Sequence, residues 1–262
     1  MKTKDESAGA TIPVRKGGGW YLYAVLPADA ERTLTTTGLG GAEVTFVVDG
    51  AVMAAVSRVA EGEKLRPERR NLAAHQGVLK ALMVDASILP VAFGIVADDE
   101  ESLRRIMSRN RSVFAQQLAH VKGKVEMGLR VSWDVPNIFE YFVTLHDDLR
   151  ETRDRIYGAR REPTQDDKIE LGRLFDRVLN EERESLSERV ETALSPIAAE
   201  LKQNRVRSER EVMNLACLVA RDQLEAFEAA VFEAARHFDD SFTFDYNGPW
   251  APHSFVEVEL KT

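Results

Sequence analysis

Apolar and polar residues alternate most regularly between residues 125 and 133. The apolar positions of this stretch are Val125, Met127, Leu129, Val131 and Trp133. A period of two places such residues on one face of a β-strand and the residues between them on the other. The pattern therefore predicts a strand with one buried face.

Two strand patterns and a hairpin are predicted nearer the N-terminus. Residues 20–26 are apolar on both faces, which is typical of a central strand. Residues 44–48 and 52–56 alternate on either side of Asp49-Gly50. Asp-Gly between two such runs favours a hairpin with a type I′ turn, which needs positive φ at two positions. A further short strand is expected at residues 90–93.

Two amphipathic helices complete the predicted N-terminal half. The first begins near Pro67 and shares one apolar face among Leu72, His75, Leu79, Leu82 and Met83. The second opens on four acids, Asp98, Asp99, Glu100 and Glu101, where negative charge favours the N-terminal end of the helix dipole. The order of strands and helices over residues 20–135 is compatible with a ferredoxin-like α+β sandwich.

A helical region is predicted after Pro136, which we take as the domain boundary. An apolar stripe from Ile138 to Leu149 predicts one helix that ends at Tyr157-Gly158. Thr164 and Asp167 resemble a capping box, so a second helix is expected to begin there. Its apolar positions between residues 171 and 194 have a near-heptad spacing, and we interpret the two helices as a coiled-coil-like hairpin.

The C-terminal region combines ambiguous and clear patterns. Residues 211–221 are dense in apolar side chains and fit either a buried strand or a helix. A helix is expected over 224–232, followed by a strand on which Phe242, Phe244 and Tyr246 alternate with polar residues. Asn247-Gly248-Pro249 is expected to end that strand. The predicted organisation is a disordered tail (1–19), the ferredoxin-like domain (20–135) and a smaller helical α+β domain (136–262).

Composition narrows the class of protein. The 262 residues are 44% hydrophobic and 30% charged, which is typical of a globular chain. No apolar run approaches the roughly 18 residues of a membrane span, and the N-terminus lacks a signal-peptide core, so a soluble, cytoplasmic protein is expected. The net charge of −8 argues against nucleic acid as a partner. Cys217 lies in an apolar run, which favours a buried, inert thiol.

Candidate catalytic and metal-binding motifs are missing from the sequence. The five histidines have no metal-ligand spacing, and the glycines at 38, 40 and 41 form no phosphate-binding loop. His75 lies on an apolar helix face, where a hydrogen-bonded core histidine is favoured over a catalytic one. The acids 98–101 fit helix capping better than a metal site. We therefore predict no catalytic residue, no cofactor and no metal.

Four segments, in this order along the chain, resemble the gas vesicle protein GvpF/GvpL family. They are Tyr21-Leu22-Tyr23-Ala24-Val25; the His75–Leu82 helix followed by Ile88-Leu89-Pro90-Val91-Ala92-Phe93-Gly94; Gly123-Lys124-Val125-Glu126-Met127 running into Trp133-Asp134; and Gly248-Pro249-Trp250-Ala251-Pro252-His253-Ser254-Phe255-Val256. The last segment resembles the GPW-P-x-SFV ending of the family, whose members often carry Tyr where this chain has His253. The resemblance extends over nearly everything from Trp20 onward, and it favours a strand at 211–221.

The resemblance implies a non-enzymatic accessory protein of gas vesicle assembly. Members of the family are cytoplasmic, associate with the vesicle and other vesicle proteins, and are thought to bind the small hydrophobic shell protein GvpA. We expect residues 20–135 to carry the main shell-protein contact. Trp250 and Phe255 are candidates either for a lid on the protein's own core or for aromatic anchors that dock a partner.

Two other functions stay open from the residues alone. A ferredoxin-like fold hosts many functions, so a small-molecule-binding regulatory module is one alternative, and a pocket with convergent polar groups would favour it. The other is an enzyme whose site brings carboxylates and His75 together in space. Strongly shifted pKa values in a cleft would favour the enzyme.

Overall fold

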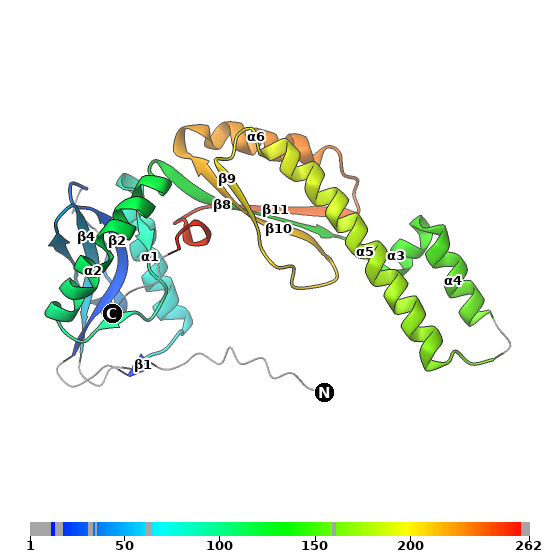
Figure 1. Ribbon diagram of the computed structural model, residues 1–262, viewed down its shortest axis with the longest axis horizontal. Helices are drawn as coiled ribbons and strands as arrows, with labels where there is room; N and C mark the ends of the chain where they lie inside the picture. Colours follow the sequence, from blue (N-terminus) through cyan, green and yellow to red (C-terminus); the bar gives the residue numbers. More distant parts are fainter. Residues whose placement is uncertain are drawn as a thin grey trace. The chain divides into compact units, whose positions relative to one another are not determined.

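The chain forms a mixed α+β structure with two compact units (Figure 1). The computed structural model describes residues 12–13, 18–30, 34, 36–60, 64–158 and 161–257. Unit 1 contains Met1–Glu126 and Pro249–Thr262, and unit 2 contains Met127–Gly248. The C-terminal residues therefore belong with the N-terminal unit. The domain boundary expected near Pro136 stays a prediction.

Unit 1 is built around a β-sheet with strand order β3-β4-β2-β6, in which β7 also pairs with β2. The strands are β2 (Gly19–Pro27), β3 (Val44–Asp49), β4 (Val52–Val59), β6 (Leu89–Pro90) and β7 (Val96–Ala97). β2 is central and almost entirely buried, as its apolar sequence predicted. Of the strand expected at 90–93, only Pro90 lies in a strand, at the end of β6, and residues 91–93 lie outside both β6 and β7. A separate pair joins β1 (Ile12–Pro13) to β5 (Lys64–Leu65), and most of the predicted tail, 1–19, lies outside the described residues.

The β3-β4 hairpin is confirmed, but its turn differs from the predicted one. Asp49 pairs with Val52, so Gly50 and Ala51 are the two loop residues. Gly50 has a φ of 63°, and no described residue other than glycine has positive φ. The type I′ prediction is therefore wrong, because the residue after Gly50 carries a Cβ and keeps negative φ.

Helices α1 (Arg69–Asp85) and α2 (Glu100–Val121) cover opposite faces of this sheet. Leu22 and Val25 pack in the core beneath α2, whereas Tyr21 lies against His75 of α1. Tyr21 and Leu22 take opposite faces, as alternation requires, and Val25 shares the face of Leu22 because the register of β2 against β4 shifts between Leu22 and Ala24. The acids at the start of α2 act as predicted, since the Asp99 carboxylate accepts a hydrogen bond from the Ser102 amide at 2.7 Å. Leu72 was predicted on the buried face of α1, but it is exposed in the first turns of that helix. A short 3₁₀ helix, η1 (Leu39–Gly41), contacts α1.

Unit 2 contains a second sheet with strand order β11-β8-β10-β9. Its strands are β8 (Lys124–Trp133), β9 (Glu200–Gln203), β10 (Glu211–Ala220) and β11 (Phe242–Trp250). The strand favoured for residues 211–221 is thus confirmed. β11 was expected to end at Asn247-Gly248-Pro249 but continues to Trp250. It lies at the sheet edge, where proline loses no ladder hydrogen bond.

The ferredoxin-like arrangement predicted for residues 20–135 is not confirmed. It required the strand at 125–133 to join the N-terminal sheet, and β8 pairs in the second sheet instead. The apolar face of β8 is covered by later residues, because the Trp133 ring lies 5.2 Å from the Phe142 ring and 6.3 Å from the Phe242 ring. The succession strand, helix, strand, strand, helix, strand occurs in unit 2, from β8 to β11.

The helices of unit 2 are α3 (Ile138–Leu145), α4 (Asp147–Tyr157), α5 (Gln165–Leu194) and α6 (Leu224–Ala235), with the 3₁₀ helix η2 (Arg221–Gln223) before α6. The single helix predicted over 138–157 is interrupted at His146, which ends α3 and precedes α4. Leu145, which lies within the predicted apolar stripe, and Phe232 of α6 are exposed.

Helix α5 begins at the predicted capping box and runs unbroken for 30 residues. The Asp167 carboxylate accepts a hydrogen bond from the Thr164 amide at 2.8 Å. The first half of α5 packs on α3 and α4, where Phe175 lies 5.4 Å from Phe139. Its second half lies with α6 along the sheet (Figure 1). The predicted coiled-coil-like hairpin is not confirmed, because α5 packs against α3, α4 and α6 along its length and not against one long partner helix.

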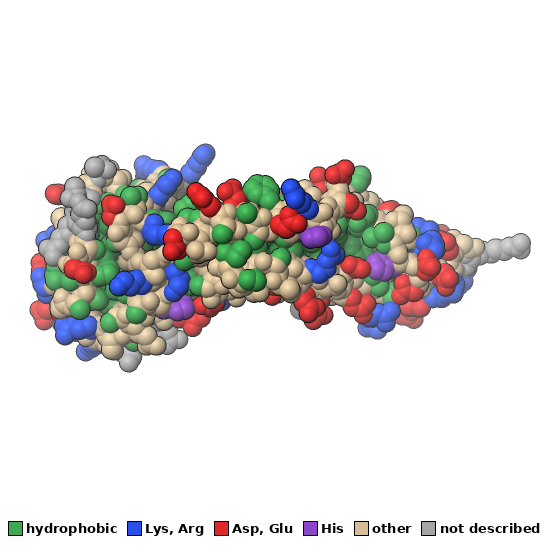
Figure 2. Space-filling view, turned by 90° about the horizontal axis from the view of Figure 1, so that it is seen from above, with side chains coloured by type: hydrophobic (Ala, Val, Ile, Leu, Met, Phe, Trp, Pro, Cys, Tyr) green, Lys and Arg blue, Asp and Glu red, His purple; other side chains and the backbone are tan. Residues whose placement is uncertain are grey.

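Charged side chains gather on α4 and the first half of α5, toward one end of unit 2 (Figure 2). Most of them form ion pairs: Arg150–Asp147, Arg153–Glu140, Arg155–Glu170, Arg161–Asp167 and Arg177–Asp148. This end is therefore a solvated helical surface. Among the described residues, no helix has both the length and the apolar character required to cross a bilayer.

Candidate functional site

The C-terminal segment, defined here as residues 249–257, packs on unit 1. It contains the 3₁₀ helix η3 (His253–Phe255). Ala251 and Phe255 are buried, and Phe255 is only 5% exposed. Val256 packs against the core beneath α2. The segment thus completes the apolar interior of unit 1 from the far end of the chain.

Two hydrogen bonds from Ser254 hold the segment to Glu126. The Ser254 amide donates to Oε2 of Glu126 at 2.8 Å, and the Ser254 hydroxyl donates to Oε1 at 2.8 Å. One carboxylate therefore accepts both donors. Hydrogen bonds to an ionised acceptor are stronger than those between neutral groups. This contact fixes the position of η3 on unit 1.

An apolar pocket of about 240 Å³ lies beside the C-terminal segment. It is lined by Val25, Leu89, Pro90, Val91, Ala92, Ile95, Phe114, His253 and Val256. Val25, Leu89 and Phe114 belong to the buried core, whereas Ala92 is exposed at the mouth. The volume is below the roughly 300–1,000 Å³ of typical small-molecule sites. The pocket suits one or two apolar side chains of a partner.

The pocket offers little polar chemistry. Among the described residues that line it, His253 is the one polar side chain, and an exposed imidazole alone provides no set of convergent groups. Catalysis by an imidazole requires a reacting group and further residues that orient it. The lining therefore favours hydrophobic contact over the chemistry of an enzyme or a small-molecule site.

His75 lies in a separate buried cluster with Tyr21 and Tyr23. Tyr21 Oη is 2.8 Å from Nδ1 of His75 and accepts a hydrogen bond from the Gly94 amide at 3.1 Å. Tyr23 Oη is 2.8 Å from the Ser57 hydroxyl and accepts a hydrogen bond from the Leu39 amide at 2.8 Å. The aromatic rings also contact one another, with 4.8 Å between the centroids of the two tyrosines.

Burial keeps His75 neutral. Its side chain is 2% exposed, and this desolvation, followed by repulsion from His253, lowers the pKa of His75 to about 4. Burial also raises the pKa of Tyr21. A neutral Tyr21 hydroxyl can then donate to a neutral His75 Nδ1. No carboxylate takes part in these hydrogen bonds, so the cluster favours the predicted core histidine over a catalytic one.

The two predicted docking residues occupy different environments. Trp250 is 47% exposed at the end of β11, whereas Phe255 is buried against unit 1. Phe255 can meet a partner only if the C-terminal segment leaves its place, so its packing fits the lid interpretation. Trp250 presents a large amphipathic surface to solvent, which suits an anchor. Neither docking role is tested by these positions.

The remaining candidate residues, Cys217 and the acids at the start of α2, lie where they stabilise the fold. Cys217 is fully buried in β10. Asp99 caps helix α2 as predicted, and Glu100 and Glu101 form (i, i+4) ion pairs with Arg104 and Arg105. Among residues that the structure describes, no three His, Cys, Asp or Glu side chains are grouped so as to hold a metal ion.

Two parts of the site could not be predicted from the sequence: the Glu126–Ser254 contact and the pocket. Glu126 was assigned to the polar face of a strand, and 128 positions separate it from Ser254. No local period connects residues so far apart. The best available signal was the cluster of apolar residues after Gly248, which indicated that the C-terminal segment packs on something.

Comparisons with known proteins agree on one family. The family model for gas vesicle synthesis protein GvpL/GvpF matches residues 19–257. Gas vesicle protein F of Nostoc sp. (strain PCC 7120) is 25% identical, and the alignment covers 92% of this chain and 98% of the relative. Gas vesicle protein L of Streptomyces sp. (strain CB03234) is 26% identical, with 91% and 92% covered.

Two solved structures share the fold. The crystal structure of gas vesicle protein GvpF from Anabaena sp. PCC7120 superposes with a TM-score of 0.82 at 24% identity, over 93% of this chain and all of that one. GvpF from Microcystis aeruginosa gives a TM-score of 0.78 at 22% identity, over 92% of this chain and 99% of that one. The α+β arrangement is therefore that of solved GvpF structures.

Proposed function

The chain belongs to the GvpL/GvpF family of gas vesicle synthesis proteins, and we propose that it is a non-enzymatic accessory protein that binds the hydrophobic shell protein GvpA through unit 1. Family membership supports a role in gas vesicles, and this family is not a known family of enzymes. The observation that carries the proposed binding is the apolar pocket beside the C-terminal segment.

A hydrophobic shell subunit needs its apolar surface shielded from water before it polymerises. Burying one large aliphatic or aromatic side chain is worth about 2 kcal/mol, so a pocket for one or two of them supplies a useful part of the affinity. Trp250, half-exposed on the C-terminal segment, would extend this apolar contact. Residues 20–135 and the returning segment would thus form one binding surface.

Membership of the same family supports a proposal for the cellular setting. We place the protein in the cytoplasm, in association with gas vesicles, with other vesicle accessory proteins as further partners. The small-molecule and enzyme alternatives receive less support, because the pocket is apolar and His75 is closed off from solvent. No specific observation favours either one enough to propose it.

The test is the capture of GvpA by the full-length chain carrying Ala92→Glu. Ala92 is exposed at the pocket mouth, so the substitution places a carboxylate where an apolar side chain would enter without disturbing the buried core. Desolvating that charge should lower the affinity for GvpA about tenfold or more. The matched control is Ala119→Glu, an exposed alanine of α2 outside the pocket. Equal capture by the two variants would contradict the proposed site.

A further inference from the structure

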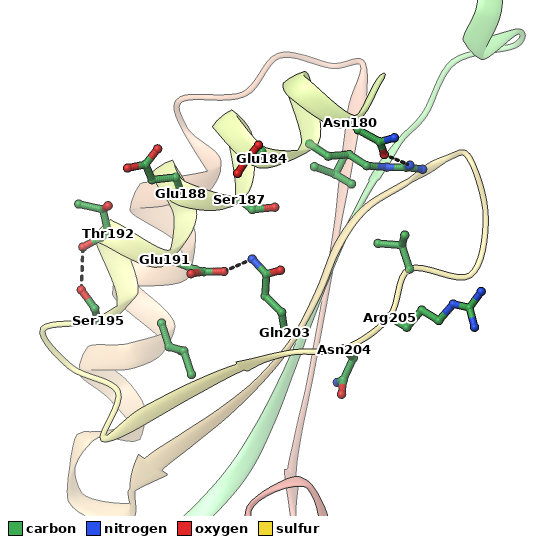
Figure 3. A pocket seen from close by; sticks show the side chains of 14 residues that line it. Asn180, Glu184, Ser187, Glu188, Glu191, Thr192, Ser195, Gln203, Asn204 and Arg205 are labelled. Atoms are coloured by element: carbon green, nitrogen blue, oxygen red, sulfur yellow. Dashed lines mark hydrogen bonds between the residues drawn. The ribbon is translucent and has the colours of Figure 1, made fainter. Parts of the chain in front are cut away.

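A groove runs between helix α5 and the end of the sheet in unit 2 (Figure 3). Its volume is about 900 Å³. Leu201 of β9, Val206 of the β9-β10 loop and Val212 of β10 give it an apolar floor, and α5 forms the opposite wall. This groove is independent of the unit 1 pocket, because all of its residues belong to unit 2.

The α5 wall carries Glu184, Glu188 and Glu191, spaced so that they share one face of the helix. Glu191 accepts a hydrogen bond from Gln203 of β9. Glu184 and Glu188 form no ion pair with any described Lys or Arg. The acids at the other end of α5 differ in this respect, since Glu170 pairs with Arg155.

Of the two arginines that line the groove, one is engaged by backbone carbonyls and the other is turned away from α5. The Arg183 guanidinium donates to the carbonyls of Ser208, Glu209 and Glu211. The Arg205 side chain points away from the α5 wall (Figure 3). The groove therefore presents negative charge from α5 to any segment that enters it.

Ser187 lies between Glu184 and Glu188 and points into the groove (Figure 3). Its side chain is 6% exposed and lines the groove, so the hydroxyl lies where a segment that enters the groove can contact it.

Strand β9 forms the open edge of the sheet beside this groove. It pairs with β10, and within the described part of the chain no strand lies on its other side. Such an edge accepts an extended peptide as an added strand. The opposite edge of the sheet, β11, is less suited because Pro249 has no N–H to donate.

We propose that β9 binds an extended segment of a partner protein that carries Lys or Arg at alternate positions. The segment adds to the sheet edge through its backbone. Its alternate side chains then enter the groove, where their stems cover Leu201 and Val206 and their charges approach Glu184 and Glu188.

The probe is a short synthetic peptide that alternates lysine and valine, titrated into the full-length chain and followed by fluorescence anisotropy. Replacing both acids, Glu184→Gln with Glu188→Gln, should weaken binding about fivefold, given the usual strength of two partly exposed ion pairs. Glu181→Gln with Glu225→Gln changes the net charge equally at exposed sites outside the groove and should leave binding unchanged.

A second pair of peptides tests strand addition itself. Methylation of alternate backbone nitrogens on one edge of the peptide removes its N–H donors while keeping every side chain. It should reduce affinity about tenfold if several backbone hydrogen bonds form. Equal binding of the methylated peptide, equal effects of the two double variants, or stronger binding of a glutamate–valine peptide would each overturn the proposal, as would no binding of the lysine–valine peptide.

Discussion

The aromatic cluster of unit 1 and the helical end of unit 2 place their polar groups in opposite ways. Unit 1 buries a neutral cluster of Tyr21, Tyr23 and His75 inside its fold, whereas unit 2 carries Arg155, Glu170 and similar groups as ion pairs on exposed helices. A buried polar group without a hydrogen bond lowers the free energy of unfolding considerably, whereas a surface ion pair changes it very little. The stability of unit 1 should therefore depend on protonation, and that of the helical end of unit 2 on salt.

The cavities of the two units also differ in the polarity of the side chains that line them. The unit 1 pocket is lined almost entirely by apolar side chains, and the unit 2 groove combines an apolar floor with an acidic wall. One is suited to a hydrophobic partner such as the proposed shell protein, and the other to an extended basic segment. This difference in polarity fits the proposal that the two cavities bind two chemically different partners.

The largest expected effect is a loss of stability at acid pH that depends on His75. Its pKa is lowered from 6.5 to about 4, so between these values the unfolded chain binds a proton that the folded chain excludes. The stabilisation is complete above pH 6.5 and is lost as the pH falls toward 4. It amounts to about 3 kcal/mol. The measurement is urea unfolding of the wild type and His75→Gln from pH 7 to pH 4.

The wild type should lose about 3 kcal/mol more than His75→Gln over this range. His120→Gln, an exposed histidine of α2, is the matched control and should follow the wild type. Parallel pH profiles for the wild type and His75→Gln would show that His75 is not the buried neutral group described here, and the contrast between the units would fail.

A smaller effect is expected at the Glu126–Ser254 contact. Ser254→Ala removes the hydrogen bond from the hydroxyl to the Glu126 carboxylate and keeps the one from the amide. The free energy needed to open the C-terminal segment should therefore fall by about 1.5 kcal/mol. Hydrogen exchange of the amides of residues 251–256 should then accelerate about tenfold. Ser241→Ala, in unit 2, supplies a control. Unchanged exchange in Ser254→Ala would mean that packing alone holds the segment.

The smallest effect is expected for the surface ion pairs of unit 2. Glu170→Gln breaks the pair with Arg155, whose two side chains are both more than half exposed. The cost should be about 0.5 kcal/mol and should shrink further in high salt. Urea unfolding at low and high ionic strength measures it. A loss comparable to that of the buried His75 cluster would remove the distinction between the two units.

Local patterns predicted local structure well. The alternation at 125–133 predicted β8, the acids at 98–101 predicted the start of α2, and Thr164 with Asp167 predicted the capped start of α5. In each case the residues that carry the signal are neighbours along the chain. The interactions that decide the structure are then the same ones that a sequence pattern records.

Pairings between distant segments were beyond the same reasoning. The period of β8 indicates a strand but not its sheet, and β8 joins β10 and β11 rather than β2. Edge position allowed β11 to continue through Pro249, which a local reading takes as a stop. The pocket depends on Val256 and His253 returning to Leu89 and Phe114, which no pattern in the sequence records.

The proposed shell-protein site can be tested most directly by hydrogen–deuterium exchange of the full-length chain with and without GvpA. We predict that GvpA slows exchange in residues 89–95 and 251–256, which line or adjoin the unit 1 pocket, and leaves α4 and the first half of α5 unchanged. Protection confined to unit 2, with residues 89–95 unaffected, would contradict the assignment of shell-protein binding to unit 1.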